Sequence, residues 1–191
     1  MAVFTGIHFL ITIYARLTTG SCPRYEPLED FSAEDFTGVW YEMERDVNFR
    51  PSSGDCVTAQ YELRDGQDGV SVTNNEVVDG ERNFIEGYAL VSSFFPGQLG
   101  VFFGGDFGAS YRVVDTDYTD YAIIYSCEQL GPFAYDLSWL LTRSRIEETD
   151  AAYTTLHDTV DPIYDSKLPD YERATLMQVT DQGSDCTYYT V

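Results

Sequence analysis

Apolar and polar residues alternate along much of this chain, which is the pattern of strands that bury one face. In the run 57–63 one face holds Val57, Ala59, Tyr61 and Leu63. Similar apolar runs, separated by turn residues, cover 70–78, 83–91, 99–103, 111–114, 121–126 and 134–142. With a strand around Trp40, these runs predict eight short strands. Such an all-β pattern is typical of an up-and-down barrel or a sandwich.

Two further patterns refine this prediction. Asp79-Gly80 is the strongest hairpin signal, because glycine tolerates the positive φ that a tight turn requires. A spacing of four residues between Ala152, Leu156 and Val160 predicts one helix, which Pro162 should end or kink. A last short strand is expected over 176–179. The sequence contains no internal repeat and no linker, so we interpret residues 21–191 as one domain.

The first twenty residues differ from the rest. An apolar run over 3–14, followed by small residues, predicts that residues 1–20 are a signal peptide cleaved near Gly20. A membrane anchor is the alternative, but the run is too short to span a bilayer. Export agrees with four widely spaced cysteines, which favour two disulfides in a secreted, extracellular protein. The sequence alone leaves their pairing open.

Charge and missing motifs exclude several classes of function. The chain has 32 acidic and 11 basic residues, a net charge of −21, so nucleic acid and stable membrane insertion are poor expectations. Solubility explains this charge, and attraction of cationic ligands is the alternative. His157 is the only histidine outside the predicted leader, and metal-binding and phosphate-binding motifs are missing. We therefore expect that the protein is not an enzyme, binds no metal and requires no cofactor.

Three separated motifs, taken in order, resemble those of the lipocalin family. They are Gly38-Val39-Trp40-Tyr41-Glu42, then Thr116-Asp117-Tyr118 with Tyr121, and then Asp136-Leu137-Ser138-Trp139-Leu140-Leu141-Thr142-Arg143. The likeness is strongest to the group that contains apolipoprotein D and the retinol-binding, bilin-binding and crustacyanin-like proteins. It implies an eight-stranded antiparallel up-and-down β-barrel, closed at one end, with one C-terminal α-helix packed outside. It also implies the pairings Cys22 with Cys127 and Cys56 with Cys186.

The resemblance assigns structural roles at the closed end. Trp40 would plug the barrel, Arg143 would lie on its ring, and Gly38 would let the strand begin. Asp117 would fix its own turn beside Tyr118. The open mouth would be formed by the loops 48–55, 92–97, 104–109 and 128–133.

Motif register and alternation then select inward side chains as candidate ligand contacts. They are Tyr61, Val72, Asn74, Ile85, Leu99, Val101, Phe103, Tyr111, Val113, Ile124, Leu137, Trp139 and Leu141. For each, ordinary core packing is the alternative. Tyr61, Tyr111 and Trp139 favour ligand contact, because aromatic walls suit apolar molecules. Asn74 and the two tyrosine hydroxyls would orient a polar group of the ligand.

These expectations lead to one main function and two rivals. The main hypothesis is a secreted carrier of a small hydrophobic molecule: a retinoid, carotenoid, bilin, steroid or fatty acid, with a bound pigment favoured by the aromatic wall. The first rival is an extracellular scavenger of cationic biogenic amines in defence, with Glu42 and Glu44 pointing inward. The second is an interaction protein, including a homo-oligomer, whose barrel is filled by its own side chains.

Overall fold

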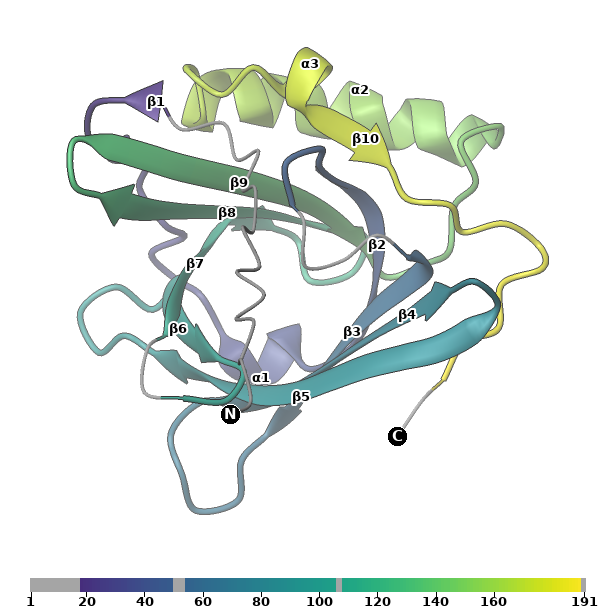
Figure 1. Cartoon of the computed structure of the whole chain (residues 1–191), viewed down its shortest axis with the longest axis horizontal. Helices are drawn as coiled ribbons and strands as arrows, with labels where there is room; N and C mark the ends of the chain where they lie inside the picture. Colours follow the sequence, from purple (N-terminus) through teal and green to yellow (C-terminus); the bar gives the residue numbers. More distant parts are fainter. Residues whose placement is uncertain (1–17, 50–53, 106–107, 190–191) are drawn as a thin grey trace, which may run out of the picture.

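A ring of antiparallel strands forms the body of the protein (Figure 1). The computed structural model describes residues 18–49, 54–105 and 108–189. Most of the predicted leader therefore lies outside the described residues. The ring consists of β2 (Gly38–Asp46), β3 (Asp55–Leu63), β4 (Val70–Val78), β5 (Glu81–Val91), β6 (Gln98–Phe102), β7 (Ala109–Thr116), β8 (Tyr121–Leu130) and β9 (Phe133–Thr142). Each strand pairs with the next, and β9 pairs with β2. This closure confirms the eight-stranded barrel.

Five shorter or peripheral elements complete the fold. The two-residue strand β1 (Thr18–Thr19) pairs with β9, and β10 (Met177–Val179) pairs with β2. The one-turn helices are α1 (Ala33–Phe36), which leads into β2, and α3 (Arg173–Leu176), which leads into β10. The long helix α2 (Ala151–Lys167) lies outside the barrel, alongside β8 and β9 in Figure 1. The external C-terminal helix is thus confirmed.

The sequence predicts that Pro162 ends or kinks helix α2, and the helix does not end there. It continues to Lys167. The reason is its buried stripe, because Leu156, Val160 and Tyr164 follow one another at intervals of four and Tyr164 lies beyond the proline. The Tyr164 hydroxyl is hydrogen-bonded to Ser138 of β9 over 3.0 Å. Packing against the barrel therefore outweighs the hydrogen bond that proline cannot donate.

The barrel wall separates two apolar cores. The outer core lies between the wall and α2 and includes Met43, Ile123, Leu140 and Val160. The inner core fills the closed end of the barrel and includes Trp40. Because successive side chains of a strand point to opposite faces, one strand supplies both cores.

Two disulfides tie the ends of the chain to the wall. Cys22 is bonded to Cys127 of β8, and Cys56 of β3 is bonded to Cys186. The structure thus has the pairing that the family resemblance implies. The sequence separations of 105 and 130 residues mean that each bridge strongly restricts the unfolded chain.

Strand direction decides which loops lie at which end. In an up-and-down barrel, the connections after β3, β5 and β7 share one end and those after β2, β4, β6 and β8 share the other. The loop 92–97 joins β5 to β6, so the prediction that it lies at the mouth is wrong. Its Gly97 donates a hydrogen bond to Leu28 at the closed end. The mouth instead contains the turn Asp79-Gly80, whose φ values of 52° and 81° fit a tight hairpin.

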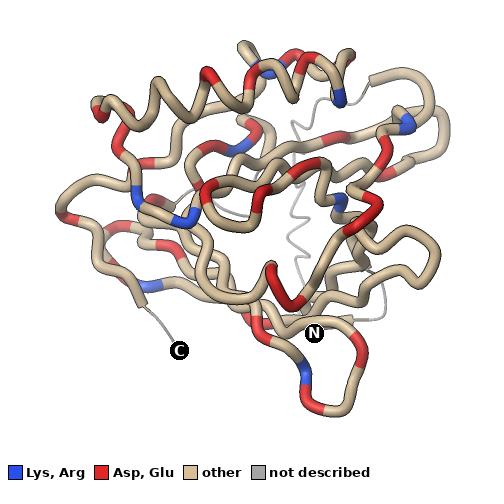
Figure 2. The backbone as a smooth tube through the Cα atoms, turned by 180° about the vertical axis from the view of Figure 1, so that it is seen from behind, with Lys and Arg blue, Asp and Glu red and all other residues tan. Residues whose placement is uncertain are grey.

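Acidic residues outnumber basic ones, 32 to 11. Figure 2 shows Asp and Glu scattered over helix, strands and loops rather than gathered on one face. Among the described residues, no helix has the length and apolar character that crossing a membrane would need.

Candidate functional site

The closed end of the barrel is built around one buried indole. Trp40 stacks on Phe36, with ring centroids 5.0 Å apart, and its Nε1 donates to the Phe36 carbonyl over 3.0 Å. The guanidinium carbon of Arg143 lies 3.8 Å from the centroid of the indole ring. The same guanidinium donates to the backbone carbonyls of Tyr118, Val39 and Asp35 over 2.9, 3.2 and 3.0 Å. One side chain therefore joins β9 to β2, to α1 and to the β7–β8 turn.

The β7–β8 turn is held by its own side chains. Asp117 Oδ1 accepts hydrogen bonds from three successive backbone amides, those of Thr119, Asp120 and Tyr121. Tyr118 adopts a φ of 66°, and its hydroxyl accepts from the Ser32 amide over 3.0 Å. Gly38 has a φ of 97°, and an added Cβ would lie 3.2 Å from Arg143. These contacts are structural, so the candidate site lies above the closed end.

Most of the sequence-predicted contact residues meet in the inner core. The structure brings together Tyr61, Val72, Leu99, Val101, Tyr111, Val113, Ile124, Trp139 and Leu141. They come from β3, β4, β6, β7, β8 and β9, so the apolar surface runs around the barrel. Phe31, Phe36 and Val70 belong to the same core. The alternation of 70–78 could have predicted that Val70 points inward. Phe31 and Phe36 lie outside the strands, so no alternation could have predicted their position.

Two tyrosines join opposite walls. The hydroxyls of Tyr61 on β3 and Tyr111 on β7 lie 2.8 Å apart. Three strands separate β3 from β7 in either direction around the ring, so this hydrogen bond crosses the interior. Burial raises the pKa of Tyr61 to about 12 and raises that of Tyr111 well above its usual value, so both remain neutral hydroxyls at physiological pH.

Four predicted contact residues lie outside this core. Ile85 and Phe103 are 48% and 36% exposed, Leu137 is buried, and Asn74 is half-buried. Across neighbouring strands Trp40 pairs with Ala59, Ala59 with Asn74, and Asn74 with Ile85. Paired residues point to the same face, so Asn74 and Ile85 both belong to the inner face. Residues 81–86 are all exposed, although alternate side chains belong to the inner face. The inner face of β5 is therefore open to solvent near the mouth.

A β-bulge in β2 changes which charges reach the interior. Glu42 pairs with Leu141, but the register shifts, and Glu44 pairs with Leu140 and Arg45 with Trp139. Glu42 and Arg45 therefore face inward and form a buried ion pair of 2.9 Å. Burial raises the pKa of Glu42, although Arg45 opposes the shift.

The inward orientation predicted for Glu44 is wrong, because the bulge turns it outward under α2. There its carboxylate lies 2.9 Å from His157 Nε2, accepts from the Tyr153 hydroxyl over 2.7 Å and forms an ion pair with Arg173. Hydrogen bonding to Glu44 raises the pKa of His157. His157 thus helps to dock the helix onto the barrel.

The sequence patterns did not predict a second carboxylate on the inner face. Glu76 shares the parity of Asn74 on β4 and is buried, and it accepts from the Gly54 amide and from Asn83 over 3.0 and 2.7 Å. Arg45 Nη2 donates to the Gly54 carbonyl over 2.9 Å. A polar layer of Glu42, Arg45, Glu76 and Asn74 therefore lies along β2 and β4. No cluster among the described residues could hold a metal ion.

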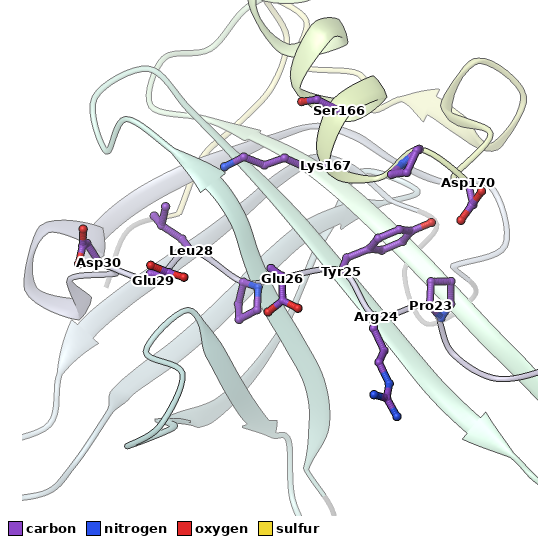
Figure 3. A pocket seen from close by; sticks show the side chains of 12 residues that line it. Pro23, Arg24, Tyr25, Glu26, Leu28, Glu29, Asp30, Ser166, Lys167 and Asp170 are labelled. Carbon is purple, nitrogen blue, oxygen red and sulfur yellow. The ribbon is translucent and has the colours of Figure 1, made fainter.

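A separate pocket lies outside the barrel. It has a volume of about 750 Å³ between the segment 23–30 and the C-terminal end of α2 (Figure 3). Figure 3 shows Tyr25 pointing toward Asp170, with Lys167 above the segment. Lys167 donates to the Val114 carbonyl over 3.3 Å and forms an ion pair with Asp115. Charged side chains of both signs, among them Lys167 and Asp170, line this pocket.

Comparisons with known proteins agree on one family. A family model described as the lipocalin / cytosolic fatty-acid binding protein family matches residues 37–158. Apolipoprotein D of Cavia porcellus is 38% identical over 170 residues, which cover 86% of this chain and 84% of that protein. The bilin-binding protein of Pieris brassicae is 30% identical over 156 residues, covering 78% and 81%.

Solved structures show the same fold. Insecticyanin of Manduca sexta superimposes with a TM-score of 0.75 at 23% identity, covering 89% of this chain and 90% of its own. Lobster apocrustacyanin A1 superimposes with a TM-score of 0.69 at 20% identity, covering 89% and 93%.

Proposed function

The chain belongs to the lipocalin family, and from this premise we propose that it is a secreted carrier of one small hydrophobic molecule held inside the barrel. The observation that carries the proposal is the apolar cluster on the inner face, together with the part of that face that is open to solvent at β5. A ligand that enters there would lose water against apolar walls, gaining about 25 cal/mol for each Å² of apolar surface buried. No covalent step is needed.

The inner wall favours an elongated or conjugated ligand. Trp139 packs edge-on against Phe49 with ring centroids 5.1 Å apart, and the Tyr61–Tyr111 bridge lies deeper. Flat ligands pack well on such rings. The candidates remain a retinoid, carotenoid, bilin, steroid or fatty acid. Bilin binding by one relative supports a pigment, and a colourless protein from the native source would contradict it.

Secretion is part of the proposal. Two disulfides persist in oxidising compartments, which supports export through the predicted signal peptide at 1–20. N-terminal sequencing of the exported protein should show a first residue close to position 21. A mature protein that retains Met1 would contradict the signal peptide.

One pair of variants tests where the ligand binds. Ile85 and Phe84 are neighbours on β5 with similar exposure, 48% and 52%, but only Ile85 shares the inner face with Asn74. Ile85→Asp should weaken binding of a fluorescent apolar probe at least about tenfold, because it places a charge where the ligand loses water. Phe84→Asp is the matched control and should change little. Equal effects, or no probe binding by the wild type, would contradict binding in the barrel.

Capture of cationic amines is the second candidate. Two carboxylates, Glu42 and Glu76, lie on the inner side, which supports it. The ion pair of Glu42 with Arg45 and the outward position of Glu44 weaken it. Calorimetry with histamine or serotonin decides, since absence of heat at millimolar ligand would end this candidate. A homo-oligomer is tested by light scattering of the same sample.

A further inference from the structure

Asn74 holds a hydrogen-bond acceptor with nothing to accept from. Its Oδ1 is buried on the inner face of β4, and no described group donates to it. Buried polar atoms in native proteins almost always have a partner, so an orphan acceptor on a binding surface indicates a group that a ligand supplies. Asn74 pairs with Ile85 of β5, at the part of the inner face that is open to solvent.

The hydrogen bond between Tyr61 and Tyr111 leaves one hydroxyl proton unused. Tyr61 and Tyr111 share a single hydrogen bond, in which only one of the two hydroxyl protons is used. No described group accepts the second proton. The interior therefore offers an unused acceptor on β4 and an unused hydroxyl donor between β3 and β7.

Charges beside these groups disfavour an anion. Glu42 and Glu76 place two carboxylates on the inner side, and Glu42 forms an ion pair with the guanidinium of Arg45. That guanidinium already donates to Glu42 and to the Gly54 carbonyl. Glu42 is close enough to oppose the ionisation of both tyrosines of the bridge. A carboxylate of the ligand would add a negative charge beside these acidic groups, where little water screens it.

We infer that the polar end of the ligand is a hydrogen-bond donor without negative charge, a hydroxyl or an amino group, and that Asn74 Oδ1 accepts from it. The inference rests on the proposed function and selects among its ligands. It favours alcohols such as retinol or a sterol and disfavours fatty acids. Asn74 thereby acts as a specificity-determining residue, and the apolar wall supplies most of the affinity.

A matched ligand series tests the inference. Dodecanol, dodecylamine and dodecanoate share one chain length and differ only in the polar end. Each is titrated at neutral pH against the wild-type protein loaded with a fluorescent apolar probe. The alcohol and the amine should displace the probe at concentrations at least about tenfold lower than dodecanoate, since one good hydrogen bond changes affinity by about that factor.

Two variants locate the effect. Asn74→Leu should reduce the advantage of the alcohol over dodecanoate about tenfold, because the acceptor is lost. Glu42→Gln should strengthen dodecanoate, because one repelling charge is lost. Thr73→Val, on the outer face of the same strand, is the control and should preserve the wild-type order.

The outcomes separate this inference from the function on which it rests. If dodecanoate displaces the probe as well as the alcohol does in the wild type, the inference is wrong and the carrier function stands. If Asn74→Leu folds and keeps the full preference for the alcohol, Asn74 is not the acceptor. If neither the probe nor any of the three ligands binds, the carrier function fails as well.

Discussion

The guanidinium of Arg143 offers the sharpest test of how the barrel is closed. Its three hydrogen bonds reach carbonyls of α1, β2 and the β7–β8 turn, and its face lies on Trp40. Arg143→Lys keeps the charge, but a single ammonium group cannot reach three carbonyls in different directions. The change should therefore open contacts between three segments while leaving the net charge of the protein unaltered.

The expected loss can be worked out from these contacts. Lysine would keep one hydrogen bond at best, so two are lost, each worth about 1.5–3 kcal/mol when the donor is charged. Part of the cation–π contact, about 0.5–2 kcal/mol, is lost as well. Because Arg143 is half-buried and such terms are not additive, the low end applies. We expect a loss of about 3 kcal/mol in the free energy of unfolding.

Urea unfolding, followed by the fluorescence of Trp40 and Trp139, measures this loss. With a slope of about 2 kcal/mol per M, the midpoint should fall by about 1.5 M. Arg145→Lys is the control, because Arg145 is exposed, donates to the Gly183 carbonyl over 3.1 Å and forms a long ion pair with Glu147 at 3.8 Å. Its midpoint should move by less than about 0.25 M. If both variants shift equally, the closed end does not depend on the guanidinium.

Three further predictions concern the turn, the helix and a disulfide. Gly69→Ala should destabilise the barrel by at least about 3 kcal/mol and Gly66→Ala by about 1 kcal/mol. Both glycines have positive φ, but only at Gly69 would an added Cβ lie 1.9 Å from a carbonyl oxygen of β5. Equal melting temperatures of the two variants would contradict this clash. The raised pKa of His157 means that its protonated ring stabilises the fold below its unfolded pKa of about 6.5, and that this contribution disappears as the pH rises through the folded pKa. The urea midpoint of the wild type should therefore exceed that of His157→Gln by more at about pH 5.5 than at about pH 9, and a difference independent of pH would refute this linkage. Replacing Cys56 and Cys186 together by serine should lower stability by about 5 kcal/mol in the loop-entropy account, because the bridge spans 130 residues, and an unchanged melting temperature would argue against it.

The strands could be predicted from the sequence because alternation is a local property. Every run predicted around the barrel overlaps one of β2 to β9, and Asp79-Gly80 forms the turn between β4 and β5. Side chains of a strand point to opposite faces in turn, so a buried face leaves its mark directly on the residue order. The family motifs added the closed end and the disulfide pairing, which no periodicity contains.

Only the tertiary structure decided which side chains share the interior. The bulge in β2 sends Glu44 out to α2 and brings Arg45 in, because one extra residue inverts every face that follows it. Helix α2 continues beyond Pro162 because Tyr164 is buried against β9, which lies far away in the sequence. The hydrogen bond between Tyr61 and Tyr111 exists only once eight strands have closed into a ring. Local patterns specify strands, whereas contacts across the barrel depend on closure and on the register between neighbouring strands.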